Sequence, residues 1–449
     1  MYIEIPEKIL NVLRRLNAAG FEAYIVGGCV RDALMGRVPH DFDITTSALP
    51  EQTMRLFSEF AVIPTGIKHG TVTILCEGEP LEITTFRVDG KYTDSRRPDS
   101  VRFTRSIAED LARRDFTMNA IAYNPDVGIV DEFGGEEDIR RRIIRCVGTP
   151  DERFREDALR IMRALRFAVS LGFGIERDTA DSLERNCSLM NNIAVERVYS
   201  ELTAMLSAWN ASDSIRGVLR EYREVFAQII PELRPCFDYQ QKSKYHTLDL
   251  YEHIIMTVET AAQLSREDYI LPLAMLLHDI GKPQCMTADN GVRHYYGHPA
   301  VSAELADKIM RRFKSSSADR KLITDIVRTH DAQLNSSAKT MRRRLAAMGE
   351  ELLRYCTLAH IADDSAKAEF CRQRIPTYYE VLDKIPEVAA QSCLTVKSLA
   401  VNGRDLSAVI KPSPKMGEIL NRLLSEVVDG TLPNEREALM KRAEELANR

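Results

Sequence analysis

The sequence predicts a mixed α+β head followed by an all-α remainder. Strand signals concentrate in the head, where FEAYIVGG, DFDITT and TVTILCEGEPLEITTFRV combine β-branched residues with alternating polarity. From residue 151 the apolar spacing becomes helical, at about 100° per residue. On this spacing one helix face carries Ala158, Ile161, Met162, Leu165, Ala168 and Val169. We therefore expect helices packed against one mixed sheet, followed by helical domains.

Each element of the head has its own signal. The first 20 or so residues are amphipathic and predict a helix, as does EQTMRLFSEF. FEAYIVGG predicts a strand that meets a glycine turn, and DFDITT predicts a second strand. The long segment after them predicts a hairpin around Gly78.

We divide the chain into four expected domains. Residues 1–147 form the head and residues 148–215 a helical neck. Residues 216–380 form a second helical domain and residues 381–449 a helical tail. The 449 residues are ample for several hydrophobic cores.

Composition excludes several classes of protein. Hydrophobic residues make up 44% and charged residues 28%, and no apolar run approaches the ~20 residues of a membrane span. The net charge is −5, so a nucleic-acid partner requires locally concentrated basic groups. Nine scattered cysteines without a CxxC pair, and an N-terminus without a signal peptide's apolar core, predict a cytoplasmic protein. The oligomeric state stays open.

The first candidate site is a set of carboxylates in the head. Asp41 and Asp43 stand two apart in HDFDI, and alternate residues of a strand share a face. Such a pair repels itself unless a hard cation such as Mg²⁺ neutralises it. Glu82 on a later strand offers a third carboxylate, as in two-metal phosphoryl-transfer sites. The alternatives are an exposed strand end and a simple ion pair between Glu82 and Arg87.

A glycine turn precedes these aspartates. In YIVGGCVRDALMG a strand ends at Gly27-Gly28 and a helix starts at once, which presents backbone N–H groups to a phosphate. Arg31 adds a fixed cation for a triphosphate. The alternative is a tight turn that needs glycine only for its backbone angles.

Together these motifs carry a resemblance. GGCVRD followed by DFD resembles the signature of DNA polymerase β-type nucleotidyltransferases. With RRDFTMNA, DEFGG and EDALRIMRALRF, residues 1–210 are similar to the bacterial class II tRNA nucleotidyltransferases and poly(A) polymerases. The resemblance implies a polymerase β-like head and Mg²⁺ at Asp41 and Asp43, with Glu82 less directly matched. It places nucleotide contacts at Gly28, Arg31 and Arg114.

The resemblance also implies a protein template for the nucleobase. The residues that match this template lie in EDALRIMRALRF and are Asp157, Arg160, Arg163 and Arg166. A carboxylate accepts from an exocyclic amine while a guanidinium donates to ring acceptors, which suits cytosine and adenine. Guanine and uracil present a carbonyl and leave buried groups unpaired. The alternative is an exposed salt bridge between residues three apart.

The implied reaction is addition of the 3′-terminal CCA to tRNA from CTP and ATP, with release of pyrophosphate. Residues 87–111 resemble the loop that relatives use to switch from cytidine to adenosine, and its length favours full CCA synthesis over a pathway split with a partner enzyme. The tail resembles the tRNA-contacting C-terminal region of class II enzymes. Poly(A) polymerase is one alternative, and a phosphohydrolase or RNA-binding protein with an inactive head is another.

A second candidate site lies in the helical part. The order His…His-Asp…Asp over residues 245–370 resembles the HD phosphohydrolase superfamily. The resemblance implies a divalent transition metal, because imidazole and carboxylate suit such ions. The implied core ligands are His253, His278, Asp279 and Asp363, with His298 and His330 as the extra ligands of two-metal members. The alternative is a degenerate, RNA-binding body.

Overall fold

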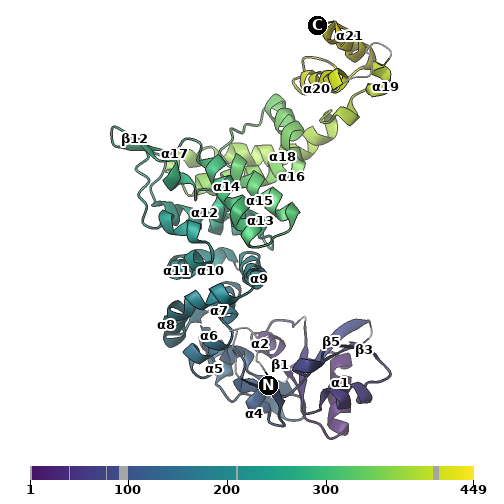
Figure 1. The fold of residues 1–449 in the computed structure, drawn as a ribbon, viewed down its shortest axis with the longest axis vertical. Coiled ribbons are helices and arrows are strands. Elements are labelled where there is room, and N and C mark those ends of the chain that lie inside the picture. Colours follow the sequence, from purple (N-terminus) through teal and green to yellow (C-terminus); the bar gives the residue numbers. More distant parts are fainter. Residues whose placement is uncertain are drawn as a thin grey trace. The chain divides into compact units, whose positions relative to one another are not determined.

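A computed structural model describes residues 3–39, 41–76, 78–90, 100–208, 211–407 and 414–448. Internal contacts divide the chain into two compact units, Met1–Pro231 and Glu232–Arg449. The strands labelled in the purple-to-blue part of Figure 1 belong to the first unit, and helices dominate the rest. Within the described residues no helix is both long and apolar enough to span a membrane. The finer division into four domains stays a prediction.

The head is built on a seven-stranded mixed sheet of order β3-β4-β5-β2-β1-β8-β9. Neighbouring strands are antiparallel except β2 and β5, which run parallel. In chain order the strands are β1 (Ala23–Val26), β2 (Asp43–Thr46), β3 (Ala61–Gly66), β4 (Thr71–Cys76), β5 (Glu79–Thr85), β8 (Ala122–Asn124) and β9 (Gly128–Val130). The accompanying helices are α1 (Glu7–Ala18), α2 (Gly28–Leu34), α3 (Pro50–Leu56), α4 (Ile107–Ala112) and α5 (Gly135–Arg141). The predicted α+β head is confirmed.

The predicted hairpin is β4–β5. Side chains alternate between buried and accessible along both strands, so one face of the hairpin packs into the head. Gly78 lies in the turn with φ +84°, which a residue without Cβ adopts without strain. A second small ladder joins β6 (Arg87–Asp89) to β7 (Val101–Phe103). Residues 91–99, the middle of the predicted switching loop, lie outside the described residues.

Helices complete the first unit. They are α6 (Pro150–Glu156), α7 (Leu159–Leu171), α8 (Arg177–Asn186), α9 (Val195–Leu206), α10 (Ala211–Glu221) and α11 (Arg223–Ile229). Every residue of the predicted apolar face from Ala158 to Val169 is buried. The helical region expected from residue 151 is interrupted at Asp157 and by the two-residue strand β11 (Gly174–Ile175), which pairs with β10 (Ile143–Ile144).

The second unit is helical apart from one small hairpin. Its body contains α12 (Leu250–Leu264), α13 (Ile270–Leu277), α14 (His298–Arg312), α15 (Ser317–Thr329), α16 (Ala338–Ser365), α17 (Glu369–Arg372) and α18 (Ile375–Gln391). The hairpin joins β12 (Thr287–Asp289) and β13 (Val292–His294). All eight residues of α13 are buried, which makes it the central helix of the body. The tail helices α19 (Gly403–Leu406), α20 (Pro414–Val428) and α21 (Arg436–Ala447) have their own core.

Candidate functional site

The head carboxylates gather beside the end of β1. Strand β2 begins at Asp43, whose partner Val26 is the last residue of β1, so Asp41 lies in extended chain before the ladder. The carboxylate of Asp41 nonetheless interacts electrostatically with that of Asp43. Burial raises the pKa of Asp43, Arg114 lowers it, and Asp41 raises it. The side chains form a like-charged pair of the kind that a bound cation stabilises.

Glu82 lies on β5, next to the aspartate strand. The parallel register pairs Ile44 with Ile83, which brings Glu82 level with Asp43. Glu82 is exposed between two buried neighbours, as the alternation predicted. The structure therefore places the third carboxylate beside Asp43, on the neighbouring strand.

The glycine turn forms as the sequence predicted. Gly27 has φ +81° and immediately precedes α2. A Cβ on Gly27 would lie 3.0 Å from Nη1 of Arg114, so the glycine lets that guanidinium approach the backbone. Arg31 donates to Asp32 at 2.8 Å and to Oδ1 of Asn119 at 2.8 Å. Both predicted cations, Arg31 and Arg114, thus lie near the turn.

Asp115 joins this corner of the head to the neck. Its carboxylate accepts from Nε of Arg163 at 2.8 Å, from Nδ2 of Asn119 at 3.1 Å and from the Phe116 N–H at 2.8 Å. Burial alone would raise the pKa of Asp115, but Arg163, Asn119 and Arg160 lower it to about 2. Because Asn119 also accepts from Arg31, the bonds form a continuous series from α2 to α7.

Three guanidinium groups surround the ring of Phe167. Those of Arg31, Arg163 and Arg166 lie 5.2, 5.3 and 4.3 Å from its centroid. Glu201 on α9 accepts from Nε of Arg166 at 2.6 Å. The neck arginines predicted from EDALRIMRALRF therefore face the same corner as the glycine-turn arginine.

The predicted template pair differs from its expected geometry. Asp157 lies in the break between α6 and α7, where its Oδ1 accepts from the Leu159 N–H at 3.1 Å. Its Oδ2 accepts from Arg197 at 3.0 Å. Arg160 donates to Glu156 at 2.7 Å and to the Arg113 carbonyl at 2.9 Å. The two residues are thus not neighbours on one continuous helix, because the backbone at Asp157 is extended and α7 begins at Leu159.

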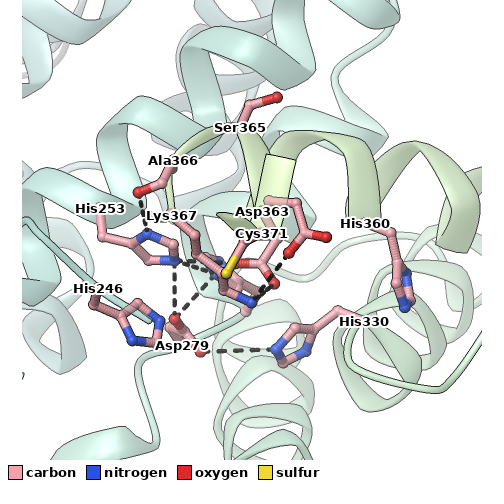
Figure 2. Close-up of polar contacts among 12 residues, drawn as sticks. His246, His253, Asp279, His330, His360, Asp363, Ser365, Ala366, Lys367 and Cys371 are labelled. Atoms are coloured by element: carbon pink, nitrogen blue, oxygen red, sulfur yellow. Dashed lines mark hydrogen bonds and ion pairs between the residues drawn. The ribbon is translucent and has the colours of Figure 1, made fainter. Parts of the chain in front are cut away.

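The second candidate site is a buried His/Asp cluster in the second unit. Four histidines each place Nδ1 2.6–3.3 Å from a backbone carbonyl, which can only accept. Nδ1 therefore carries the hydrogen, and Nε2 presents a lone pair to the cluster. The four are His253, His278, His298 and His330. Figure 2 shows His253 and His330 on either side of Asp279.

These lone pairs face one another in two pairs. Nε2 of His253 and His278 are 3.4 Å apart, and Nε2 of His298 and His330 are 3.3 Å apart. Oδ2 of Asp279 lies 3.1–3.3 Å from the first pair, and its Oδ1 lies 3.2–3.7 Å from the second. Oδ2 also forms an ion pair with Lys282, whereas Oδ1 has no hydrogen-bond partner among the described residues. Converging lone pairs of this kind fit two metal ions that share Asp279.

The adjacent aspartates of α16 have different surroundings. Asp363 places Oδ1 3.2 Å from Nε2 of His253, within the cluster. Asp364 accepts instead from Arg374 at 2.7 Å and from the Tyr378 hydroxyl at 3.1 Å. The structure therefore groups all four predicted core residues and leaves Asp364 outside.

Three models of known families match the chain. One described as "Poly A polymerase head domain" matches residues 23–145, and one described as "Probable RNA and SrmB- binding site of polymerase A" matches residues 172–237. A third, described as "tRNA nucleotidyltransferase domain 2 putative", matches residues 299–443. None of the three is described as an HD domain.

Curated relatives extend the match to the whole chain. The CCA-adding enzyme of Ligilactobacillus salivarius is 33% identical over 446 residues, which cover 98% of this chain and 96% of the relative. The CCA-adding enzyme of Lacticaseibacillus paracasei is 35% identical over 439 residues, which cover 98% of this chain and 96% of the relative. The chain belongs to the CCA-adding enzyme family. The Geobacillus kaustophilus member is 55% identical over 201 residues, 45% of this chain and 49% of the relative.

Solved structures of the CCA-adding enzyme family have the same fold. The crystal structure of the Bacillus stearothermophilus CCA-adding enzyme in complex with CTP has a TM-score of 0.73 and 30% identity, and covers 98% of this chain and 96% of that one. The Thermotoga maritima CCA-adding enzyme complexed with tRNA has a TM-score of 0.62 at 21% identity, which supports the fold alone. The predicted nucleotidyltransferase resemblance is confirmed.

Sequence reasoning missed three side chains of the buried cluster. Lys282 Nζ lies 2.6 Å from Oδ2 of Asp279 and 3.2 Å from Nε2 of His246. Lys367 forms an ion pair with Asp363. Burial is the main cause that lowers the pKa of His246, and the charge of Lys282 is the next. The pKa falls to about 2, so the ring is neutral. Lys282 follows Asp279 by three residues in HDIGK, a spacing that signals contact across one turn.

We expect Asp115 to make folding stability depend on acid pH. A carboxyl whose pKa falls from 3.8 to about 2 on folding contributes about 2 kcal/mol near neutral pH, and this contribution is lost as pH falls from about 4 to 2. The free-energy difference between wild type and Asp115→Asn in urea unfolding should therefore shrink by about that amount between pH 6 and pH 2. Asp126→Asn, at an exposed position, is the control. A difference that stays constant with pH contradicts this role.

Proposed function

We propose that the chain adds the 3′-terminal CCA to tRNA from CTP and ATP, with release of pyrophosphate, at the head site. The observation that carries the proposal is the convergence of the carboxylates, the glycine turn and the neck arginines on one corner of the first unit. Full-length similarity to CCA-adding enzymes supports it. From cysteine usage we also propose that the reaction takes place in the cytoplasm.

We assign the head carboxylates to cation binding. Asp41 and Asp43 would hold Mg²⁺, with Glu82 as a further ligand, because the two aspartates are close enough for the charge of one to raise the pKa of the other. When bound, such an ion neutralises phosphate charge and activates the tRNA 3′ hydroxyl for attack on the α-phosphorus. Gly28 begins α2 and would offer its backbone N–H to the phosphates, and Arg31 and Arg114 would offset their negative charge. Positioning and charge stabilisation account for the catalysis.

In this proposal, side chains of the neck select the nucleobase. Asp157 and Arg160 hold polar partners within the protein, and a cytosine or adenine edge would exchange with those partners. Arg163 and Arg166, fixed against Phe167 and Glu201, would line the same nucleotide pocket. A base with a carbonyl at that edge would leave buried groups unpaired and be rejected.

The His/Asp cluster supports a second activity, metal-dependent phosphohydrolysis. The observation in its favour is the two pairs of imidazole Nε2 atoms that share the oxygens of Asp279. Mn²⁺, Ni²⁺, Fe²⁺ and Zn²⁺ suit this mixture of ligands. The proposed ligands are His253, His278, Asp279 and Asp363 at one position, and His298 and His330 at the other.

Single substitutions should separate the two sites. Asp41→Ala is expected to lower CTP incorporation into a tRNA lacking CCA on the order of a thousandfold, because it removes a metal ligand, and to leave phosphohydrolysis intact. His278→Ala is expected to do the opposite. Incorporation of radiolabelled nucleotide and phosphate release measure the two. Loss of both activities in either variant contradicts the two-site scheme.

Metal binding tests the second cluster without catalysis. Titration calorimetry with Mn²⁺ should show at least one tight site in the full chain. His278→Ala should weaken it by more than about a hundredfold, since a direct ligand matters more than an outer-shell partner. His69→Ala, in the first unit, should leave it unchanged. Equal binding by wild type and His278→Ala overturns the assignment.

A further inference from the structure

Phe167 lies on the charged side of the neck helix α7. At about 100° per residue it falls between Arg160 and Arg163, opposite the apolar face that begins at Ala158. A phenylalanine that serves only the hydrophobic core is expected on the apolar face. Phe167 is nevertheless only 5% exposed, so groups other than the α7 core cover its ring.

The groups that cover the ring include three guanidiniums. Arg166, also on α7, lies 4.3 Å from the ring centroid, and Arg163, one turn earlier, lies 5.3 Å from it. Arg31 reaches the same ring from α2 in the head, at 5.2 Å. All three lie within the ~6 Å over which the negative face of an aromatic ring attracts a cation. One ring thus contacts cations from the head and from the neck.

A second aromatic side chain fixes the ring. Phe116 meets Phe167 edge to face, with the ring centroids 6.0 Å apart and the planes at 88°. Phe116 is buried, and it follows Asp115, the carboxylate that accepts from Arg163. The orientation of the Phe167 ring is therefore set from within the head, and the three guanidiniums pack against a fixed support.

Each guanidinium also has a carboxylate partner. The ion pairs have lengths of 2.6–2.8 Å and join Arg31 to Asp32, Arg163 to Asp115 and Arg166 to Glu201. These carboxylates offset the repulsion among three like charges around one ring. An ion pair fixes the position of a charge, whereas contact with a ring face also fixes the plane of a guanidinium and so the direction of its N–H groups.

Some of these N–H groups remain available to a ligand. Among the described residues, Nη1 and Nη2 of Arg166 have no hydrogen-bond partner, because the contact with Glu201 uses Nε alone. Arg163 directs Nε and Nη2 to Asp115, and its Nη1 lies 3.8 Å from Glu201. The remaining groups can donate to the oxygen atoms of a nucleotide.

We propose that Phe167 is a positioning residue of the nucleotide site: its ring sets the direction in which Arg31, Arg163 and Arg166 present their N–H groups to the incoming nucleotide. This role rests on the proposed function, which assigns these arginines to CTP and ATP. Phe167 acts through the arginines rather than on the nucleotide. The proposed base template has partners other than this ring, so the choice among bases does not depend on it.

Fluorine substitution tests this role with little change in packing. Phenylalanines that carry one, two or three ring fluorines are incorporated at position 167 of the full chain. Each fluorine withdraws negative charge from the ring face and weakens its attraction for a cation. Calorimetric titration with CTP and Mg²⁺ should show a dissociation constant that rises with each fluorine, to about tenfold in the trifluoro protein. Equal affinity across the series overturns the positioning role.

Leucine substitutions provide a matched comparison. Phe167→Leu should weaken CTP and ATP by the same factor, about tenfold, and leave the preference for CTP over UTP unchanged. Phe57→Leu is the control, because Phe57 is 1% exposed and lies 5.0 Å from the guanidinium of Arg15, which is outside the site. It removes the same kind of contact and should change neither affinity. Loss of the CTP preference in Phe167→Leu contradicts a role confined to the three arginines.

Binding and nucleotide addition are measured separately, so the two proposals can fail separately. Wild-type CTP affinity in the fluorinated proteins, in a chain that completes CCA, overturns the role of Phe167 alone. A graded loss of CTP affinity in a chain that adds no nucleotide to tRNA contradicts the proposed function alone. A wild-type chain that binds neither CTP nor ATP contradicts both.

Discussion

The carboxylate of Asp115 is the interaction on which the head site depends. It is buried, and it accepts hydrogen bonds from Asn119 at the head and from Arg163 in the neck. Asn119 in turn holds Arg31, which follows the glycine turn, while Arg163 lies against Phe167. A group that stays ionised down to about pH 2 thus fixes cations from both parts of the first unit around one corner. Loss of that charge would leave several buried donors unpaired.

A comparable constraint orders the second unit. Backbone carbonyls fix the tautomer of four histidines, so that their Nε2 lone pairs all face inward. Lys282 and Lys367 balance the charge of Asp279 and Asp363. The head site combines a like-charged pair of carboxylates with arginines, whereas this cluster combines facing imidazole nitrogens with a shared aspartate. The two sets of residues belong to different units of the chain, so we treat them as separate sites.

Several features were predictable from the sequence because they depend on local order. Alternating polarity gave the β4–β5 hairpin, and the apolar helical period gave the buried face of α7. That β2 begins at Asp43 and leaves Asp41 outside was not predictable from the sequence, because it depends on where the neighbouring strand β1 ends. At the interruption, the Asp157 side chain accepts a hydrogen bond from the Leu159 N–H, a local bond that competes with continued helix.

Contacts between distant segments were also beyond the sequence. Asp115 and Arg163 are 48 residues apart, and nothing in either motif identifies the other as its partner. The residues that line the cavity beside the His/Asp cluster come from β13, from the segment before α12 and from the segment that leads into α14, so only the fold brings them together. The order of the HD-type residues predicted the cluster itself, since each falls at a helix end or on a buried helix face.

The sequence of nucleotides added to a tRNA tests the central claim most directly. A transcript that ends at the nucleotide before CCA is incubated with the full chain, Mg²⁺, CTP and ATP, and the new 3′ ends are sequenced. The account predicts cytidine, cytidine and adenosine, followed by a stop. Open-ended adenylate, or no addition at all, would contradict it.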